Sequence, residues 1–510
     1  MPSRFRPDDD AGSMAVYLIL AIVGMALGAL IVPMIITSSQ NTRSDTSRVH
    51  ALDAAQAGLN VMLGRVRNAK INDVGTSTLL PCTSTTGLVN GVGPASYEVS
   101  IDYYMVDPVT TSGAQRMTCV NGYGTYDPVS QSFTPRYARL TSVGRDGTPS
   151  NGSTRGRTLT ATYVFQTTNS NIVGGRIRIY PASSSSPELC MDAGQTAPSA
   201  GAPVRLQPCI TPPRDQQVFA YRSDLTLQLL SSISGTYPLG LCLDTLGPAT
   251  LGRTIFLGAC QALGTPTYTQ QWSFNDDGGY TAALETSAAT GDLASVCISA
   301  ASQSAGMPLV LASCSAGGTT SPTQAWIPFP QVGAGAAQAP QLVNFFEFGR
   351  CLDVTNQNVN SNHLIDFPCK QNPDPTAVRW NQKFTLPPIA DPATTTSATG
   401  QIYTTIPSGT RYCLTSPGTS EGWVTVIPCS GTNSRQVWTT YNGHPSLTRS
   451  MKYTIVDSSG LCLGLTSPAG SEQWSAIDVE SCSGADELKW NAPPNLDNSA
   501  LQDINEVPTS

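Results

Sequence analysis

Cysteines recur in pairs along most of this 510-residue chain, and their spacing constrains the fold more than any other feature. Twelve of the 14 cysteines form six successive pairs whose members are 16 to 20 residues apart. An even number of regularly spaced cysteines predicts disulfide bonds and therefore an oxidising compartment. The predicted pairs are Cys190–Cys209, Cys242–Cys260, Cys297–Cys314, Cys351–Cys369, Cys413–Cys429 and Cys462–Cys482, with Cys82–Cys119 formed by the remaining two.

Metal binding is the alternative explanation for paired cysteines, and the sequence argues against it. The pairs lack the short separations of zinc sites, and the chain has only 3 histidines. We therefore expect neither a metal nor a cofactor. Charged residues make up only 12% of the chain, the formal net charge is −7 and no basic run occurs, so we expect no nucleic-acid partner.

After residue 172, each cysteine pair belongs to a longer repeat that closes on an aromatic residue. Five of the six repeats have a glutamine two places before this residue. Apolar residues three and five places before the second cysteine would lie on one face of a strand. In the fourth repeat the inner position holds Asp366, so we expect that strand to be shifted locally. The closing residues, 52 to 58 positions apart, indicate a repeat architecture; they are Phe219, Trp272, Trp326, Phe384, Trp438 and Trp490.

These repeats resemble the ricin-type lectin repeat. The resemblance rests on Cys-Leu-Asp, on the apolar pair before the second cysteine and on Gln-x-Trp, all in register. Three such repeats close one β-trefoil in that family, so the resemblance implies two tandem β-trefoils. They would span 172–331 and 342–494, with a Gly/Ala-rich linker at 332–341 and a C-terminal tail at 495–510.

The resemblance also implies where carbohydrate would bind. An aspartate would accept hydrogen bonds from sugar hydroxyls, a ring before the second cysteine would stack on the sugar, and amides near the closing aromatic would complete the site. The fourth repeat matches best; it has Asp353, Phe367, Asn381 and Gln382. Two repeats that lack the ring are weaker candidates. The first has Asp192 with Gln216 and Gln217, and the second has Asp244 with Gln270 and Gln271; of these amides we expect Gln217 and Gln271 to bind. The other three lack the aspartate and would only complete the fold; they have Ser299, Thr415 and Gly464.

The N-terminal part of the chain predicts one long helix over 13–70. No charged residue occurs from Ala11 to Thr42, and the apolar run Met14–Thr37 is long enough to cross a bilayer, with a kink at Pro33. An amphipathic stripe follows at steps of three and four; it comprises Leu52, Ala55, Leu59, Met62, Leu63 and Val66. Segments of alternating polarity between 71 and 171 predict a small antiparallel sheet, so the predicted fold is mainly β.

This N-terminus resembles that of type IV pilins and pseudopilins. In that class a peptidase removes a short polar leader, here residues 1–12, by cleavage between Gly12 and Ser13. Major subunits carry a glutamate at the fifth position after the cut, where this chain has Tyr17. This departure points to a minor tip subunit or to no filament at all. The implied partners are the membrane and other pilin subunits. A plain signal anchor is the alternative.

The sequence predicts a binding protein rather than an enzyme. Only the segment 71–171 is left for a catalytic domain; it is poor in acidic residues and contains no serine-hydrolase motif, and no zinc-protease motif occurs in the chain. We expect a pilin-like adhesin that binds glycans outside the cell. The alternative is a structural or protein-binding surface subunit whose trefoils have lost sugar binding.

Overall fold

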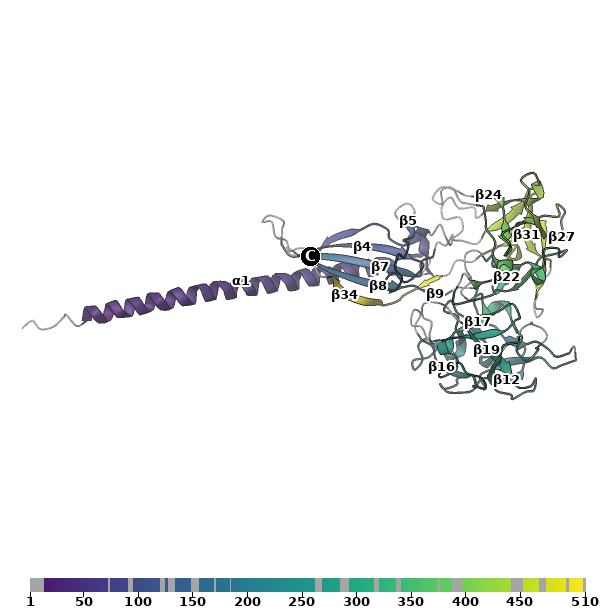
Figure 1. Cartoon of the computed structure of the whole chain (residues 1–510), viewed down its shortest axis with the longest axis horizontal. Coiled ribbons are helices and arrows are strands. Elements are labelled where there is room, and N and C mark those ends of the chain that lie inside the picture. The colour runs from purple at the N-terminus through teal and green to yellow at the C-terminus, as the bar shows by residue number, and fades with distance from the viewer. Residues whose placement is uncertain are drawn as a thin grey trace, which may run out of the picture.

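The computed structural model describes most of the chain and is mainly β (Figure 1). A long helix leads into a small sheet domain, the head, and two β-rich lobes lie at the opposite end from the helix. The first lobe spans residues 171–335 and the second lobe 341–491. The described residues are 13–71, 74–89, 95–119, 124–126, 134–147, 156–168, 171–183, 185–261, 268–284, 293–315, 321–335, 341–374, 377–387, 397–441, 453–466, 474–491 and 495–507.

The long helix α1 (Ser13–Arg67) has two halves with different surroundings. Large apolar side chains of the first half, such as Leu20 and Leu30, are exposed, and Pro33 lies inside the helix without ending it. By length and composition this half could cross a membrane. The second half packs on the head sheet, and its buried residues are Ala51, Ala54, Ala55, Leu59, Met62 and Val66. Leu52, which we expected in this stripe, is 37% exposed instead. The predicted junction at Gly12 lies outside the described residues.

The head is an antiparallel sheet in the order β3-β4-β7-β8-β34, with α1 across one face. Its strands are β3 (Thr85–Leu88), β4 (Ser96–Tyr104), β7 (Tyr137–Arg145), β8 (Gly156–Val164) and β34 (Leu501–Val507). The helix lies so close to the sheet that a Cβ at Gly144 would be 2.0 Å from the carbonyl oxygen of Ala51. Glycine at this position therefore permits the contact. Short two-stranded pairs are β1 (Lys70–Ile71) with β2 (Val74–Gly75) and β5 (Thr118–Cys119) with β6 (Thr125–Tyr126).

The C-terminal residues belong to the head, so the prediction of a separate tail at 495–510 is wrong. β33 (Asn495–Asp497) pairs with β9 (Gln166–Thr168), and β34 pairs antiparallel with β8. The edge of β8 would otherwise present unpaired backbone groups, which β34 satisfies. Both lobes are therefore an insertion between two neighbouring strands of the head.

The first lobe consists of three four-stranded antiparallel sheets. The first, in the order β12-β11-β10-β21, has β10 (Ile177–Ile179), β11 (Leu189–Asp192), β12 (Arg205–Pro208) and β21 (Trp326–Pro328). The second has β13 (Phe219–Tyr221), β14 (Leu227–Leu229), β15 (Leu241–Asp244) and β16 (Phe256–Ala259). The third has β17 (Trp272–Phe274), β18 (Tyr280–Ala283), β19 (Leu293–Ala300) and β20 (Leu309–Ser313). Each sheet carries one cysteine pair.

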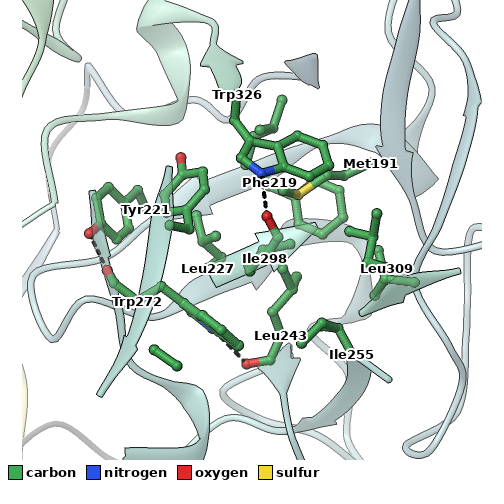
Figure 2. Packing of buried hydrophobic residues seen from close by; sticks show 14 of the residues in the cluster. Met191, Phe219, Tyr221, Leu227, Leu243, Ile255, Trp272, Ile298, Leu309 and Trp326 are labelled. Carbon is green, nitrogen blue, oxygen red and sulfur yellow. Dashed lines mark hydrogen bonds between the residues drawn. The ribbon is translucent and has the colours of Figure 1, made fainter. Parts of the chain in front are cut away.

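A closed ring of backbone hydrogen bonds joins the three repeats of the first lobe. The N–H of Val204 donates to Ile255, that of Ile255 to Leu309 and that of Leu309 to Val204, over 2.9 to 3.0 Å. These residues lie five places before the second cysteine of each repeat, so the ring has approximate threefold symmetry. Figure 2 shows the core that surrounds it, where the indole N–H of Trp272 donates to the carbonyl of Leu243 and that of Trp326 to Ile298.

The second lobe repeats this arrangement less regularly, with one eight-stranded and one three-stranded sheet. Leu364, Val424 and Ile477 form the corresponding ring, with all three hydrogen bonds 2.9 Å long. Both rings are compatible with a β-trefoil in each lobe. The strands are β22 (Arg350–Asp353), β23 (Ile365–Pro368), β24 (Ser397–Gln401), β25 (Tyr403–Thr405), β26 (Arg411–Thr415), β27 (Gly422–Trp423), β28 (Thr425–Pro428), β29 (Val437–Tyr441), β30 (Thr454–Asp457), β31 (Leu461–Leu465) and β32 (Ser475–Ser481).

All seven predicted disulfides are confirmed. The expected local shift at Asp366 is wrong, because Asp366 pairs with Leu352 just as Leu257 pairs with Leu243 in the second repeat. Its carboxyl group is fully buried beside Arg350 and Glu347. Burial raises its pKa well above the usual value, and the nearby Glu347 raises it further against the opposing effect of Arg350.

The two lobes are in direct contact. The N–H of Gln371 in the second lobe donates to the carbonyl of Phe274 in the first over 2.8 Å. Parts of the predicted linker belong to the lobes themselves, since Val332 is buried in the core of the first and Gln341 donates to Gln382 in the second. Residues 336–340 of that linker lie outside the described residues.

Candidate functional site

The glutamine before each closing aromatic forms the same hydrogen bonds in five repeats, which we call the glutamine bridge. Its Oε1 accepts from the N–H that follows the second cysteine, and its Nε2 donates to the carbonyl that precedes that cysteine. The bridge therefore fixes the chain on both sides of the disulfide, which is a structural role. The five glutamines are Gln217, Gln270, Gln324, Gln382 and Gln436.

Three glutamine bridges also hold the aspartate of the Cys-x-Asp motif. Gln217 donates to Asp192 over 2.8 Å, Gln270 to Asp244 over 2.8 Å and Gln382 to Asp353 over 2.9 Å. The three carboxylates are only 2 to 6% exposed. Each is thus oriented by the protein before any ligand arrives.

The second repeat requires a correction. The predicted partner of Asp244 was Gln271, but the side chain of Gln271 donates to the carbonyl of Asp224 instead. The glutamine two places before Trp272 is Gln270, and it is the residue that reaches Asp244. The sequence already marks Gln270 by its place two residues before the closing aromatic, the place that Gln217 and Gln382 occupy in their repeats.

The fourth repeat brings all four predicted residues together, but at the contact between the lobes. Asp353 accepts from Asn381 on one oxygen and from Gln382 on the other, both over 2.9 Å. The Nζ of Lys370 lies 2.8 Å from Oδ2 of Asp353 and 2.7 Å from Oδ1 of Asp276 in the first lobe. Burial raises the pKa of Asp353, and the charge of Lys370 opposes this shift.

The aromatic side chain of the fourth repeat, Phe367, also lies in the contact between the two lobes. Phe367 packs against the core of the first lobe, and Lys370 Nζ lies 5.7 Å from its ring centroid. A sugar at Asp353 would have to displace the ammonium of Lys370 and part the two lobes. In the described arrangement this set of residues therefore joins the lobes. Lys370 and Asp276 were not identified from the sequence, because neither belongs to the repeat pattern.

The second repeat has no room for an aromatic side chain at Gly258, the position two residues before its second cysteine. A Cβ at Gly258 would lie 2.2 Å from Oδ2 of Asp244, so the carboxylate itself occupies the space where a ring would stand. Asp244 also accepts from the N–H of Leu246 over 2.6 Å. Asp244 thus accepts one hydrogen bond on each oxygen, and no aromatic ring can stand beside it.

The first repeat has the same contacts at its carboxylate and differs in the amide beside its glutamine bridge. Asp192 accepts one hydrogen bond on each oxygen, from the N–H of Gly194 over 2.6 Å and from Gln217. A carboxylate can accept about four hydrogen bonds, so two remain. Gln216 stands where Asn381 does in the fourth repeat, and its Oε1 is buried without a hydrogen-bond partner among the described residues. Such an unsatisfied acceptor favours a ligand that supplies hydroxyl donors.

The remaining repeats have replaced the aspartate, as predicted from the sequence. Thr415 accepts weakly from Gln436 over 3.4 Å, while the side chain of Ser299 donates to backbone carbonyls. In the sixth repeat Leu488 replaces the glutamine, and a Cβ at Gly464 would lie 2.4 Å from its Cδ2. An apolar side chain thus fills the space that the Asp–Gln pair occupies elsewhere.

Comparisons with known proteins give only distant likenesses. No protein-family model and no curated protein matches the chain. Among solved structures it is similar to the agglutinin from Abrus precatorius, at 17% identity with 64% of this chain and 97% of that chain covered and a TM-score of 0.22. It is also similar to a designed threefold-symmetric protein, ThreeFoil, at 20% identity with 31% and 96% covered and a TM-score of 0.23. An exo-β-1,3-galactanase from Clostridium thermocellum matches at 11% identity, with 81% and 95% covered and a TM-score of 0.22. Scores this low carry no conclusion about function.

Proposed function

We propose that this protein is a membrane-anchored carbohydrate-binding protein that presents two ricin-type β-trefoils outside the cell. The exposed apolar half of α1 supports the anchor, and seven disulfides support an oxidising exterior. The pilin-like role, with Ser13 as the mature N-terminus and other pilin subunits as partners, is the finer form of this proposal. A long helix packed on a small sheet is the arrangement that such a role requires.

The observation that carries the carbohydrate-binding proposal is the first repeat. It combines a fixed carboxylate with spare acceptor capacity, Asp192, and an unpartnered buried amide oxygen on Gln216. Sugar hydroxyls donate hydrogen bonds to both kinds of acceptor. We therefore place the first repeat ahead of the fourth, whose carboxylate is held by Lys370.

A glycan array on the full-length chain in lipid nanodiscs tests this function. Gln216→Ala should remove most binding to the glycan that the array identifies and leave the melting temperature unchanged, because its Oε1 has no described protein partner. Gln271→Ala is the matched control, because its amide contacts Asp224 rather than an aspartate of the repeat motif. Equal binding by wild type and Gln216→Ala would exclude the first repeat as the site.

A structural or protein-binding role for the lobes is the second candidate function. The observation that favours it is the use of Asp353, Phe367 and Lys370 to join the lobes, which turns the best sequence match to a sugar site into a protein–protein contact. Absence of any array signal from a correctly folded wild-type chain would support this candidate.

A further inference from the structure

Three aromatic rings gather on the second lobe at a place that the repeat motif does not assign. The ring of His363 lies 5.1 Å from that of Trp423 and 5.7 Å from that of Trp474, measured between centroids. The two indoles are 48% and 47% exposed, whereas the four closing tryptophans are fully buried. We call His363, Trp423 and Trp474 the aromatic cluster.

The aromatic cluster lies next to the closed ring of backbone hydrogen bonds in the second lobe. Leu364, Val424 and Ile477 form that ring of hydrogen bonds. His363 and Trp423 directly precede the first two, and Trp474 lies three places before the third. The residues that directly precede the corresponding ring in the first lobe are Pro203, Thr254 and Pro308. In the first lobe the closed ring of backbone hydrogen bonds therefore forms without aromatic neighbours. The fold alone does not explain why the second lobe has aromatic residues there.

A buried carboxylate lies beside these rings. Asp478 is directly opposite Trp423 in the pairing of β27 with β32, which places both side chains on the same face. Asp478 is 2% exposed, and its Oδ1 has no hydrogen-bond partner among the described residues. Burial of an unsatisfied carboxylate is unfavourable unless something supplies donors to it.

We propose that the aromatic cluster and Asp478 form a second carbohydrate site, which binds an oligosaccharide of uncharged sugars. The indole faces stack against the apolar face of the sugar rings, and hydroxyl groups donate to Asp478. The neighbouring Glu421 and Glu480 make the surroundings negative, which disfavours anionic sugars. Because His363 contacts both indoles, it fills the space between them, so the rings form a surface rather than a cage for an ammonium ion.

The position of this site suits an extracellular ligand. Figure 1 shows β27, which carries Trp423, on the outer side of the second lobe, at the opposite end of the molecule from α1. Half-exposed aromatic rings held in place by a third ring lose little conformational freedom on binding. This inference rests on the proposed carbohydrate-binding function but uses residues outside the first repeat.

Calorimetric titration of the full-length chain with an N-acetylglucosamine hexamer, a galacturonate hexamer and choline tests the proposal. We expect the neutral hexamer to bind, and Trp423→Ala and Trp474→Ala each to weaken its binding about tenfold, the loss expected for one stacked ring. Asp478→Asn should weaken it also. Phe346→Ala is the matched control, because Phe346 is an equally exposed ring, 49%, elsewhere on the second lobe.

The outcomes separate this site from the first repeat. Loss of binding in Trp423→Ala but not in Gln216→Ala supports the aromatic cluster, while the reverse overturns it and leaves the proposed function in place. Absence of binding by wild type to the neutral hexamer and to every glycan on the array overturns both. Tighter binding of choline or of the galacturonate hexamer than of the neutral hexamer overturns the assignment to uncharged sugars.

Discussion

The Nζ of Lys370 lies 2.8 Å from Oδ2 of Asp353, the carboxylate that the repeat motif marks as the best sugar ligand. The same ammonium reaches Asp276 of the first lobe. Lys370 therefore satisfies a buried acceptor within the second lobe and joins the two lobes. The Asp–Gln pair of the fourth repeat thus stabilises the fold and, with Lys370 in place, does not form an open binding site.

Substitution of Lys370 should destabilise the protein far more than substitution of a surface lysine. Lys370→Met leaves Asp353 buried without its countercharge, for which we expect a loss of about 3–5 kcal/mol. Lys489→Met is the control, because its pair with Asp486 is partly exposed, with the two side chains 21% and 49% accessible, and should contribute at most about 1 kcal/mol. Urea denaturation of both variants measures the difference. Equal denaturation midpoints would show that Asp353 does not depend on Lys370.

The two adjacent glutamines of the second repeat should differ in their effect on stability. Gln270→Ala removes the glutamine bridge and a donor to Asp244, so we expect a loss of about 2–3 kcal/mol. Gln271→Ala removes one hydrogen bond to the carbonyl of Asp224 and should cost about 1 kcal/mol. Thermal unfolding of the two variants distinguishes them, and the opposite order would contradict the assignment of the bridge.

Asp478 should make stability depend on pH. Burial, with a smaller contribution from Glu480, raises its pKa from 3.8 to about 7, so the folded state keeps a proton that the unfolded chain has lost. Wild-type stability should therefore fall as pH rises from about 4 to about 7, by up to about 4 kcal/mol. Asp478→Asn should remove this loss and be more stable than wild type at pH 8 but not at pH 4. Calorimetry at the two pH values would contradict this if the variant gained nothing at pH 8.

The sixth repeat should tolerate Gly464→Asp and Leu488→Gln together better than either substitution alone. Leu488→Gln alone places a polar amide in an apolar space, and Gly464→Asp alone places a side chain against Leu488. The double variant can form the hydrogen bond seen between Asp244 and Gln270. A double-mutant cycle should give a favourable coupling of about 1 kcal/mol or more, and additive losses would argue against equivalent geometry in this repeat.

Local spacing predicted the parts of the fold that local chemistry determines. Each of the six disulfides in the lobes closes within one repeat, so its two cysteines could be paired from their separation alone. Val204 and Leu206 could be assigned to the core because a period of two places both side chains on the inner face of one strand. The single long helix followed from an uncharged run that continues into an amphipathic one.

Contacts between distant segments could not be predicted in this way. The pairing of β34 with β8 joins residues more than 300 positions apart, and no periodicity in either segment indicates it. Whether Asp353 is open or covered depends on Asp276, which belongs to the other lobe. The aromatic cluster was missed for a different reason. His363 and Trp423 each directly precede a residue of the closed hydrogen-bond ring, and the ricin-type motif does not include that position.

Glycan-array binding by the full-length chain in nanodiscs tests the central claim most directly, with wild type compared to a variant that combines Gln216→Ala with Trp423→Ala. We expect wild type to bind uncharged glycans and the double variant to lose that binding while its melting temperature is unchanged. A folded wild-type chain that binds no glycan, or a double variant that binds as wild type does, would contradict the account.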